Sequence, residues 1–110
     1  MTNQIACVYV TASSKEEAER IARIVVDDRL AACVNVFDGM TSFFHWQGKT
    51  NVAQEVVLFI KTNQILVDEL IQRVLTLHSY DTPCIMSWAI DKGAPDFLKW
   101  VCQETIIGEK

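Results

Sequence analysis

The sequence predicts a single α+β domain in which a long β-hairpin is the dominant element. Residues 33–47 and 52–61 have the composition of strands, and only the turn-forming residues 48–51 separate them. Residues 5–11 are apolar and partly β-branched, as in a buried strand. No repeat, linker or low-complexity segment interrupts the chain, so we expect residues 1–110 to form one domain.

A helix is predicted after the first strand. Ser13 or Ser14 is the expected cap, and Glu16 and Glu17 follow at the spacing of a capping box. We expect the helix to end near residues 28–29. Its apolar stripe recurs at i, i+3, i+4 and i+7, and consists of Ala18, Ile21, Ala22 and Val25.

The two arms of the hairpin differ in pattern. In the first arm, strand alternation places Met40, Phe44 and Trp46 on one face and Phe43 and His45 on the other. The second arm contains a continuous apolar run over residues 56–60, which indicates a strand covered on both faces.

The remaining elements complete a recognisable order. A second helix is predicted over residues 64–77, followed by Pro83 and a strand over residues 84–90. Pro95 then opens a short third helix. The resulting order, β-α-β-β-α-β-α, predicts a ferredoxin-like βαββαβ sandwich with a long central hairpin and a short C-terminal helix. The second helix has Val67, Leu70, Ile71 and Val74 as its stripe, and the third has Phe97, Trp100 and Val101.

The length of the hairpin predicts an oligomer. Arms of this length exceed the usual strand of about 5–6 residues, so shorter neighbouring strands cannot cover them. Phe43, Phe44 and Trp46 lie near its tip, where exposed aromatic rings on a free ribbon favour aggregation. We therefore expect the hairpin to lie against other copies of the chain.

Charge and composition exclude several classes of partner. The formal net charge is −4 and the Lys and Arg residues are scattered, so neither nucleic acid nor an anionic membrane is an expected partner. The N-terminus does not have the pattern of a signal peptide, and no apolar stretch is long enough to span a bilayer. We expect a cytoplasmic protein whose four Cys are free thiols.

Several short motifs, taken together and in order, resemble the CutA family, the divalent-cation-tolerance proteins. The resemblance covers nearly the whole chain. The motifs are Leu30-Ala31-Ala32-Cys33-Val34-Asn35, Phe44-His45-Trp46-Gln47-Gly48-Lys49, Glu55 six residues before Lys61-Thr62, His78-Ser79-Tyr80-Asp81-Thr82-Pro83 and Phe97-Leu98-Lys99-Trp100-Val101.

The resemblance implies a ferredoxin-like homotrimer whose hairpin strands pair across subunits, and a role in tolerance of copper and other divalent metals. It implies no enzymatic reaction. The chain departs from the family pattern at the proposed copper ligands. Where some bacterial members have a Cys and a pair of His, this chain has Val10, Leu77 and His78. It also has Phe44 in place of the usual Tyr and Cys84 in place of Glu.

Two groups of residues are candidates for binding. His78 and Cys84 are the candidate metal ligands, because they flank one turn and carry nitrogen and sulfur donors. The competing interpretation of all four Cys, Cys7, Cys33, Cys84 and Cys102, is that they are small core residues. The second candidate is an intersubunit pocket that combines aromatic rings with a carboxylate and an ammonium group, formed by Trp46, Glu55, Lys61, Tyr80 and Trp100.

Three hypotheses on function follow. The first is a non-enzymatic trimer that acts in divalent metal tolerance, with at most weak binding of Cu(II) or another divalent cation. The alternative is a signalling module similar to the PII proteins, which binds a small metabolite or anion between subunits. The third is a scaffold for an unidentified protein partner. No catalytic residues are predicted, because the chain has neither a phosphate loop nor a nucleophile elbow.

Overall fold

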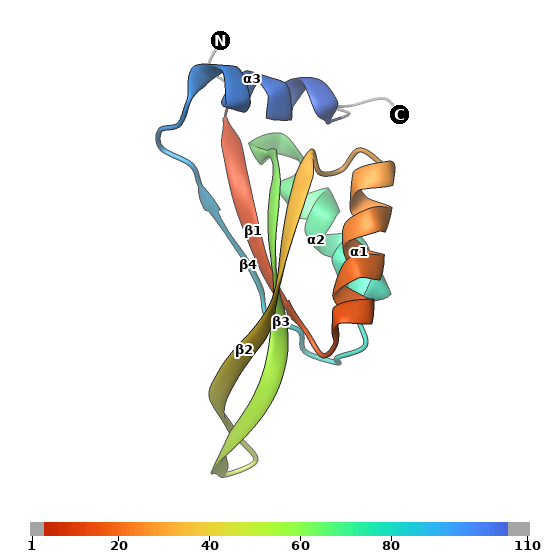
Figure 1. Cartoon of the computed structure of the whole chain (residues 1–110), viewed down its shortest axis with the longest axis vertical. Helices are drawn as coiled ribbons and strands as arrows, with labels where there is room; N and C mark the ends of the chain where they lie inside the picture. The colour runs from red at the N-terminus through yellow and green to blue at the C-terminus, as the bar shows by residue number, and fades with distance from the viewer. Residues whose placement is uncertain (1–3, 106–110) are drawn as a thin grey trace.

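The computed structural model describes residues 4–105, which fold as an antiparallel four-stranded sheet with two helices against one face (Figure 1). The strand order is β2-β3-β1-β4, so the ferredoxin-like α+β fold predicted from the sequence is confirmed. The elements are β1 (Ile5–Ala12), α1 (Lys15–Asp27), β2 (Cys33–Trp46), β3 (Lys49–Asn63), the 3₁₀ turn η1 (Gln64–Leu66), α2 (Val67–Leu77), β4 (Ile85–Ala89) and α3 (Pro95–Glu104).

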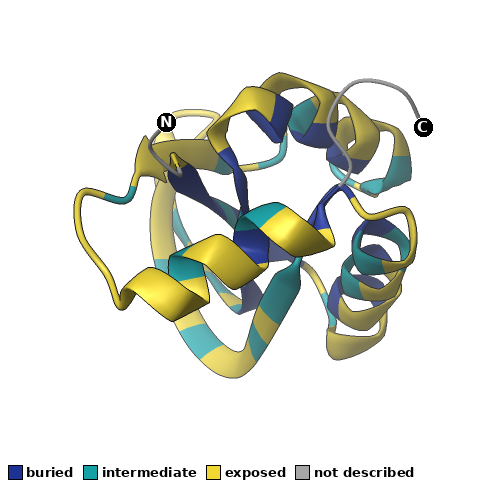
Figure 2. Cartoon of the chain, turned by 90° about the horizontal axis from the view of Figure 1, so that it is seen from above, coloured by how far each residue is buried: buried dark blue, intermediate teal, exposed yellow. Residues whose placement is uncertain are grey.

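Strand alternation divides the sheet into a covered face and an open face. The even-numbered residues of β1 are fully buried beneath α1 and α2, whereas Cys7 and Tyr9 lie on the opposite side. On that side Val57 is buried and Phe59 is half-buried, its ring packing edge-on against Tyr9. The main core therefore lies between the helices and the sheet (Figure 2). The face without helices is called the open face below.

The termini of the helices follow from local chemistry. Ser14 caps α1 by accepting a hydrogen bond from the Glu17 N–H. At the other end, Arg29 adopts a left-handed φ of 61°, and its N–H bonds to Val26 while the Leu30 N–H bonds to Val25. These bonds form a Schellman motif that ends α1. The second helix begins later than predicted, because residues 64–66 form a 3₁₀ turn.

The C-terminal helix crosses the end of the sheet that is farthest from the hairpin tip (Figure 1). The Arg29 guanidinium donates hydrogen bonds to the carbonyls of Gln103 and Glu104, which are otherwise unsatisfied at the end of α3. Only Val101 of this helix is fully buried. Within the described residues, none of the helices combines the length and apolar character that a membrane crossing needs.

The hairpin projects beyond the rest of the sheet. β1 pairs with β3 only over residues 56–63, so residues 40–46 and 49–55 pair with each other alone (Figure 1). The tip is a two-residue turn at Gln47 and Gly48, with φ of 50° and 81°, which matches a type I′ turn. The prediction placed the turn at residues 48–51 and was wrong, since residues 49–51 already belong to β3.

A bulge changes which side chains of the hairpin share a face. Phe37 pairs with Val57, but the next pair is Met40 with Glu55, so one extra residue lies in β2. Gly39 accommodates it with a φ of 88°. Before the bulge the odd-numbered residues of β2 lie on the open face, and after it the even-numbered ones do. The predicted grouping of Met40, Phe44 and Trp46 on one face is thus confirmed.

We expect Gly39→Ala to destabilise the protein by about 1 kcal/mol or more, because only glycine adopts this φ without strain. A Cβ at Gly39 would meet no atom within 4 Å, so the cost is purely one of backbone conformation. Gly39→Asn is the matched variant, and it should cost less because Asn tolerates the left-handed region. Urea unfolding followed by circular dichroism measures both, and equal loss in the two variants would contradict this explanation.

Candidate functional site

A cleft of about 690 Å³ lies on the open face, where the hairpin leaves the body of the sheet. Its walls come from β1, both arms of the hairpin and the loop between α2 and β4. The lining residues are Tyr9, Thr11, Ser42, Phe44, Trp46, Asn51, Ala53, Glu55, Tyr80, Asp81, Thr82 and Cys84.

The pairing register of the hairpin determines which of its side chains line the cleft. Phe44 pairs with Asn51 and Ser42 with Ala53, and all of these side chains point to the same face as Glu55. They reach the side of Tyr9 only because of the bulge at Gly39. If the same sequence paired with β3 regularly, without a bulge, Phe43 and His45 would line the cleft in place of Phe44 and Trp46.

The loop between α2 and β4 is held in place by its Tyr and His. The Tyr80 hydroxyl donates a 3.0 Å hydrogen bond to Oε2 of Glu55, across the cleft. The Tyr80 N–H donates to Nδ1 of His78 at 3.1 Å, and the two rings pack with their centroids 4.9 Å apart. Tyr80 therefore fixes the position of Glu55 relative to the loop.

His78 is a structural residue in this arrangement. Its side chain is completely buried, and Nε2 lies 2.7 Å from the carbonyl oxygen of Thr11. A carbonyl can only accept, so Nε2 carries the proton and Nδ1 uses its lone pair to accept from Tyr80. Neither nitrogen has a lone pair left for a metal ion.

A buried carboxylate beneath this loop joins it to the start of α1. Glu17 accepts from the N–H and the hydroxyl of Ser13 through Oε1, and from the Ser79 N–H at 2.7 Å through Oε2. Burial opposes ionisation of this group, but the hydrogen bonds from Ser13 and Ser79 outweigh burial and lower its pKa from 4.5 to about 2. Glu17 is thus ionised at neutral pH and links two segments that carry the cleft.

The charge in the cleft is negative. Burial and the neighbouring Glu55 carboxylate raise the pKa of Tyr80 to about 12. Burial and Glu55 also raise the pKa of the Cys84 thiol, and burial raises that of Tyr9. These three groups therefore stay neutral near pH 7. The lining residues include Glu55 and Asp81 but no Lys, Arg or His.

The structure brings together some of the predicted pocket residues and separates others. Trp46, Glu55 and Tyr80 line the cleft. Lys61 does not, because its ammonium group bonds to Oδ1 of Asn35 and to the carbonyl of Phe59. Trp100 lies on α3, where its ring packs against Phe97 with centroids 5.8 Å apart.

The cleft also contains residues that the sequence did not single out. Tyr9 is the main one, because residues 5–11 have the composition of a buried strand and were predicted to be one. Strand alternation within β1 was the available signal, since Tyr9 is its only large polar ring.

The two candidate metal ligands lie in different surroundings. His78 is buried against Thr11, whereas Cys84 is exposed and lines the cleft. The interpretation of the Cys residues as core residues holds for Cys7 but not for Cys84, and all four thiols are free. Among residues 4–105, no group of three or more His, Cys, Asp or Glu side chains is placed to hold a metal ion. The donors of one chain therefore do not form a coordination site by themselves.

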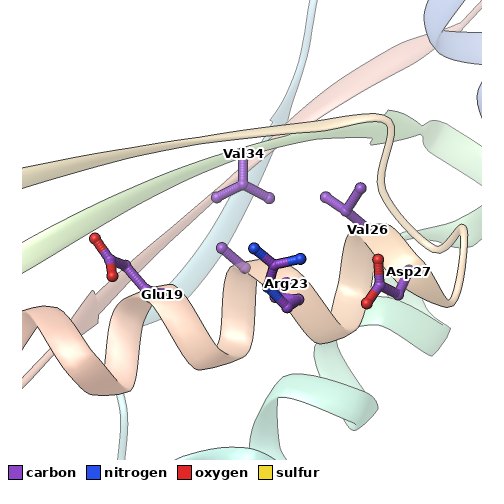
Figure 3. A pocket seen from close by; sticks show the side chains of 6 residues that line it. Glu19, Arg23, Val26, Asp27 and Val34 are labelled. Carbon is purple, nitrogen blue, oxygen red and sulfur yellow. The ribbon is translucent and has the colours of Figure 1, made fainter.

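A second groove, of about 530 Å³, runs between α1 and the edge strand β2 (Figure 3). It carries charges of both signs and no aromatic ring, so it offers no preference for a ligand of one charge. Its lining residues are Glu19, Ala22, Arg23, Val26, Asp27 and Val34.

Comparison with known proteins gives one consistent result. A family model described as the CutA1 divalent ion tolerance protein matches residues 6–104. The divalent-cation tolerance protein CutA of Archaeoglobus fulgidus is 44% identical over 99 residues, which cover 90% of this chain and 95% of that protein. The chloroplastic protein CutA of Arabidopsis thaliana is 37% identical over 89% of this chain, but the match spans only 54% of its length.

The fold is also that of a solved relative. A structure described as the periplasmic divalent cation tolerance protein CutA from Archaeoglobus fulgidus superimposes with a TM-score of 0.88 at 42% identity, covering 91% of this chain and 97% of that one. The names of these two relatives describe one as chloroplastic and the other as periplasmic. The cytoplasmic location expected from the sequence therefore stays a prediction.

We expect the stability of the protein to fall as the pH drops from 4.5 towards 2. The folded-state pKa of Glu17 is depressed, so its stabilisation is complete above 4.5 and is lost as the carboxylate becomes protonated. The loss is on the order of 3 kcal/mol. Urea unfolding of Glu17→Gln at constant protein concentration should show a lower midpoint at pH 7 and a flatter acid dependence.

Glu19→Gln is the matched control, because Glu19 lies on the same helix with its side chain 59% exposed and 3.9 Å from Lys15. Its acid dependence should follow that of the unmodified protein. An unchanged acid dependence in Glu17→Gln would contradict the role assigned to the buried carboxylate.

Proposed function

Because the chain belongs to the family of CutA1 divalent ion tolerance proteins, we propose that it acts in divalent-cation tolerance as a non-catalytic homotrimer. The observation that carries the proposal is the open face of the sheet. Phe37, Met86 and Trp88 lie there with 67%, 54% and 45% of their surface exposed. An apolar surface of this kind, on the uncovered side of a sheet, is typical of a subunit interface.

The projecting hairpin supports the same proposal. Residues 40–46 and 49–55 pair only with each other, and an isolated two-stranded ribbon is marginally stable in water. Contact with a neighbouring copy would cover Phe43 and Val52, which pair near the tip on the face away from the cleft and are 72% and 57% exposed. The trimer therefore provides the burial that a single chain of this length cannot provide for its hairpin.

We propose a non-catalytic role because the side chains of the cleft are poorly suited to catalysis. Cys84 is the strongest potential nucleophile there, and its raised pKa keeps it in the less reactive thiol form. The His that would serve as a general base has both nitrogens engaged with Thr11 and Tyr80. These features favour a binding role.

In this proposal the protein binds divalent cations weakly and holds no metal ion as a permanent cofactor. Cys84 and Glu55 are donors that face the cleft, but they do not complete a coordination set within the described part of one chain. A second copy would have to supply further ligands. The alternative role as an anion-binding signalling module receives less support, because Lys61, its expected anion ligand, is directed to Asn35.

We expect light scattering at micromolar concentration to give a mass of about three times 12.5 kDa. Trp88→Glu should lower the mass towards that of the single chain, because it places a charge in the apolar open face. Leu75→Glu is the control, since Leu75 is 41% exposed on α2, the side of the domain away from the open face. A single-chain mass for the unmodified protein would overturn the proposal.

Titration with Cu(II) tests the metal ligands. We expect weak binding in the unmodified protein, unchanged affinity in His78→Ala at conditions where it stays folded, and reduced affinity in Cys84→Ser. The reason is that His78 has no free lone pair, whereas the Cys84 thiol is accessible. A loss of affinity in His78→Ala with Cys84→Ser unaffected would show that the ring is released to bind the metal.

A further inference from the structure

We propose that the cleft on the open face binds an organic cation, a small molecule with an alkylammonium group held by the rings of Trp46, Phe44 and Tyr80 beside the Glu55 carboxylate. The inference goes beyond divalent-cation tolerance, and it names a ligand class for a site that the family assignment leaves without one.

The charge of the cleft is the first support. Its lining contains two carboxylates and no basic side chain, so a ligand with a positive charge is favoured and an anion is repelled. Neither Glu55 nor Asp81 forms an ion pair with any residue in 4–105. Glu55 uses Oε2 to accept from Tyr80, and Oε1 accepts no hydrogen bond from the residues that the structure describes.

The aromatic walls are the second support. Trp46 and Phe44 are 56% and 42% exposed, and the alternation of β2 turns both side chains towards the cleft. Exposed ring faces of Trp, Tyr and Phe attract alkylammonium groups through their negative quadrupole, and Trp does so most strongly. The ligand's carbon atoms would at the same time cover apolar surface that now faces water.

These walls distinguish an organic cation from a metal ion. Ring faces do not replace the oxygen, nitrogen or sulfur ligands that a divalent cation needs. An alkylammonium group needs only a carboxylate and aromatic surface. The cleft volume of about 690 Å³ also falls within the usual range for small-molecule sites.

Calorimetric titration of the full chain with choline at low ionic strength tests the proposal, since choline is a simple trimethylammonium probe. The matched ligand is its uncharged carbon isostere, in which a tert-butyl group replaces the trimethylammonium group. We expect choline to bind about tenfold more tightly than the isostere. Glu55→Gln and Trp46→Leu should each weaken choline binding by about fivefold to tenfold.

Phe43→Leu is the control variant, because Phe43 is exposed on the opposite face of the same strand and should leave choline binding unchanged. Equal affinity for choline and the isostere, no binding of choline, or full binding by Glu55→Gln would each overturn the inference. So would tighter binding of inorganic phosphate than of choline. Light scattering on the same samples separates the organic-cation site from the proposed homotrimer. A trimer that does not bind choline would contradict only the organic-cation site.

Discussion

The single extra residue in β2 determines which side chains of the hairpin lie on the open face of the sheet. At Asp38 and Gly39 the strand gains one residue over its partner, and every later side chain changes face. Phe44 and Trp46 consequently join the face that carries Tyr9 and the sheet residues without helical cover. If the same sequence paired regularly, Phe43 and His45 would face the cleft instead, and the Trp46 ring would be turned away from it.

Two consequences follow from the division between the covered and open faces. The helices bury one side of the central strands β1 and β3, so the stability of the isolated chain comes from that side. The open side carries the apolar surface proposed to contact other copies and, where the hairpin departs, a negatively charged cleft with aromatic walls. The buried Glu17, together with His78, holds the loop that completes this cleft.

Most of the fold could be predicted because periodicity is a local property of the sequence. The stripes of both long helices, the strands and the face shared by Phe44 and Trp46 were all evident from spacing. The hairpin turn was misplaced because Gln47 adopts a positive φ that its residue type does not indicate. The directions of Lys61 and His78 could not be predicted, since they depend on Asn35 and Thr11, which are distant in sequence.

The central claim is that the bulge creates a negatively charged aromatic cleft that stays accessible when copies of the chain assemble. A crystal structure of the full chain grown with tetramethylammonium tests it most directly. The account predicts a trimer with the ion over the ring of Trp46, within about 6 Å of its centre, and next to the Glu55 carboxylate. A side chain of a neighbouring copy filling the space between Trp46 and Tyr80 would contradict it.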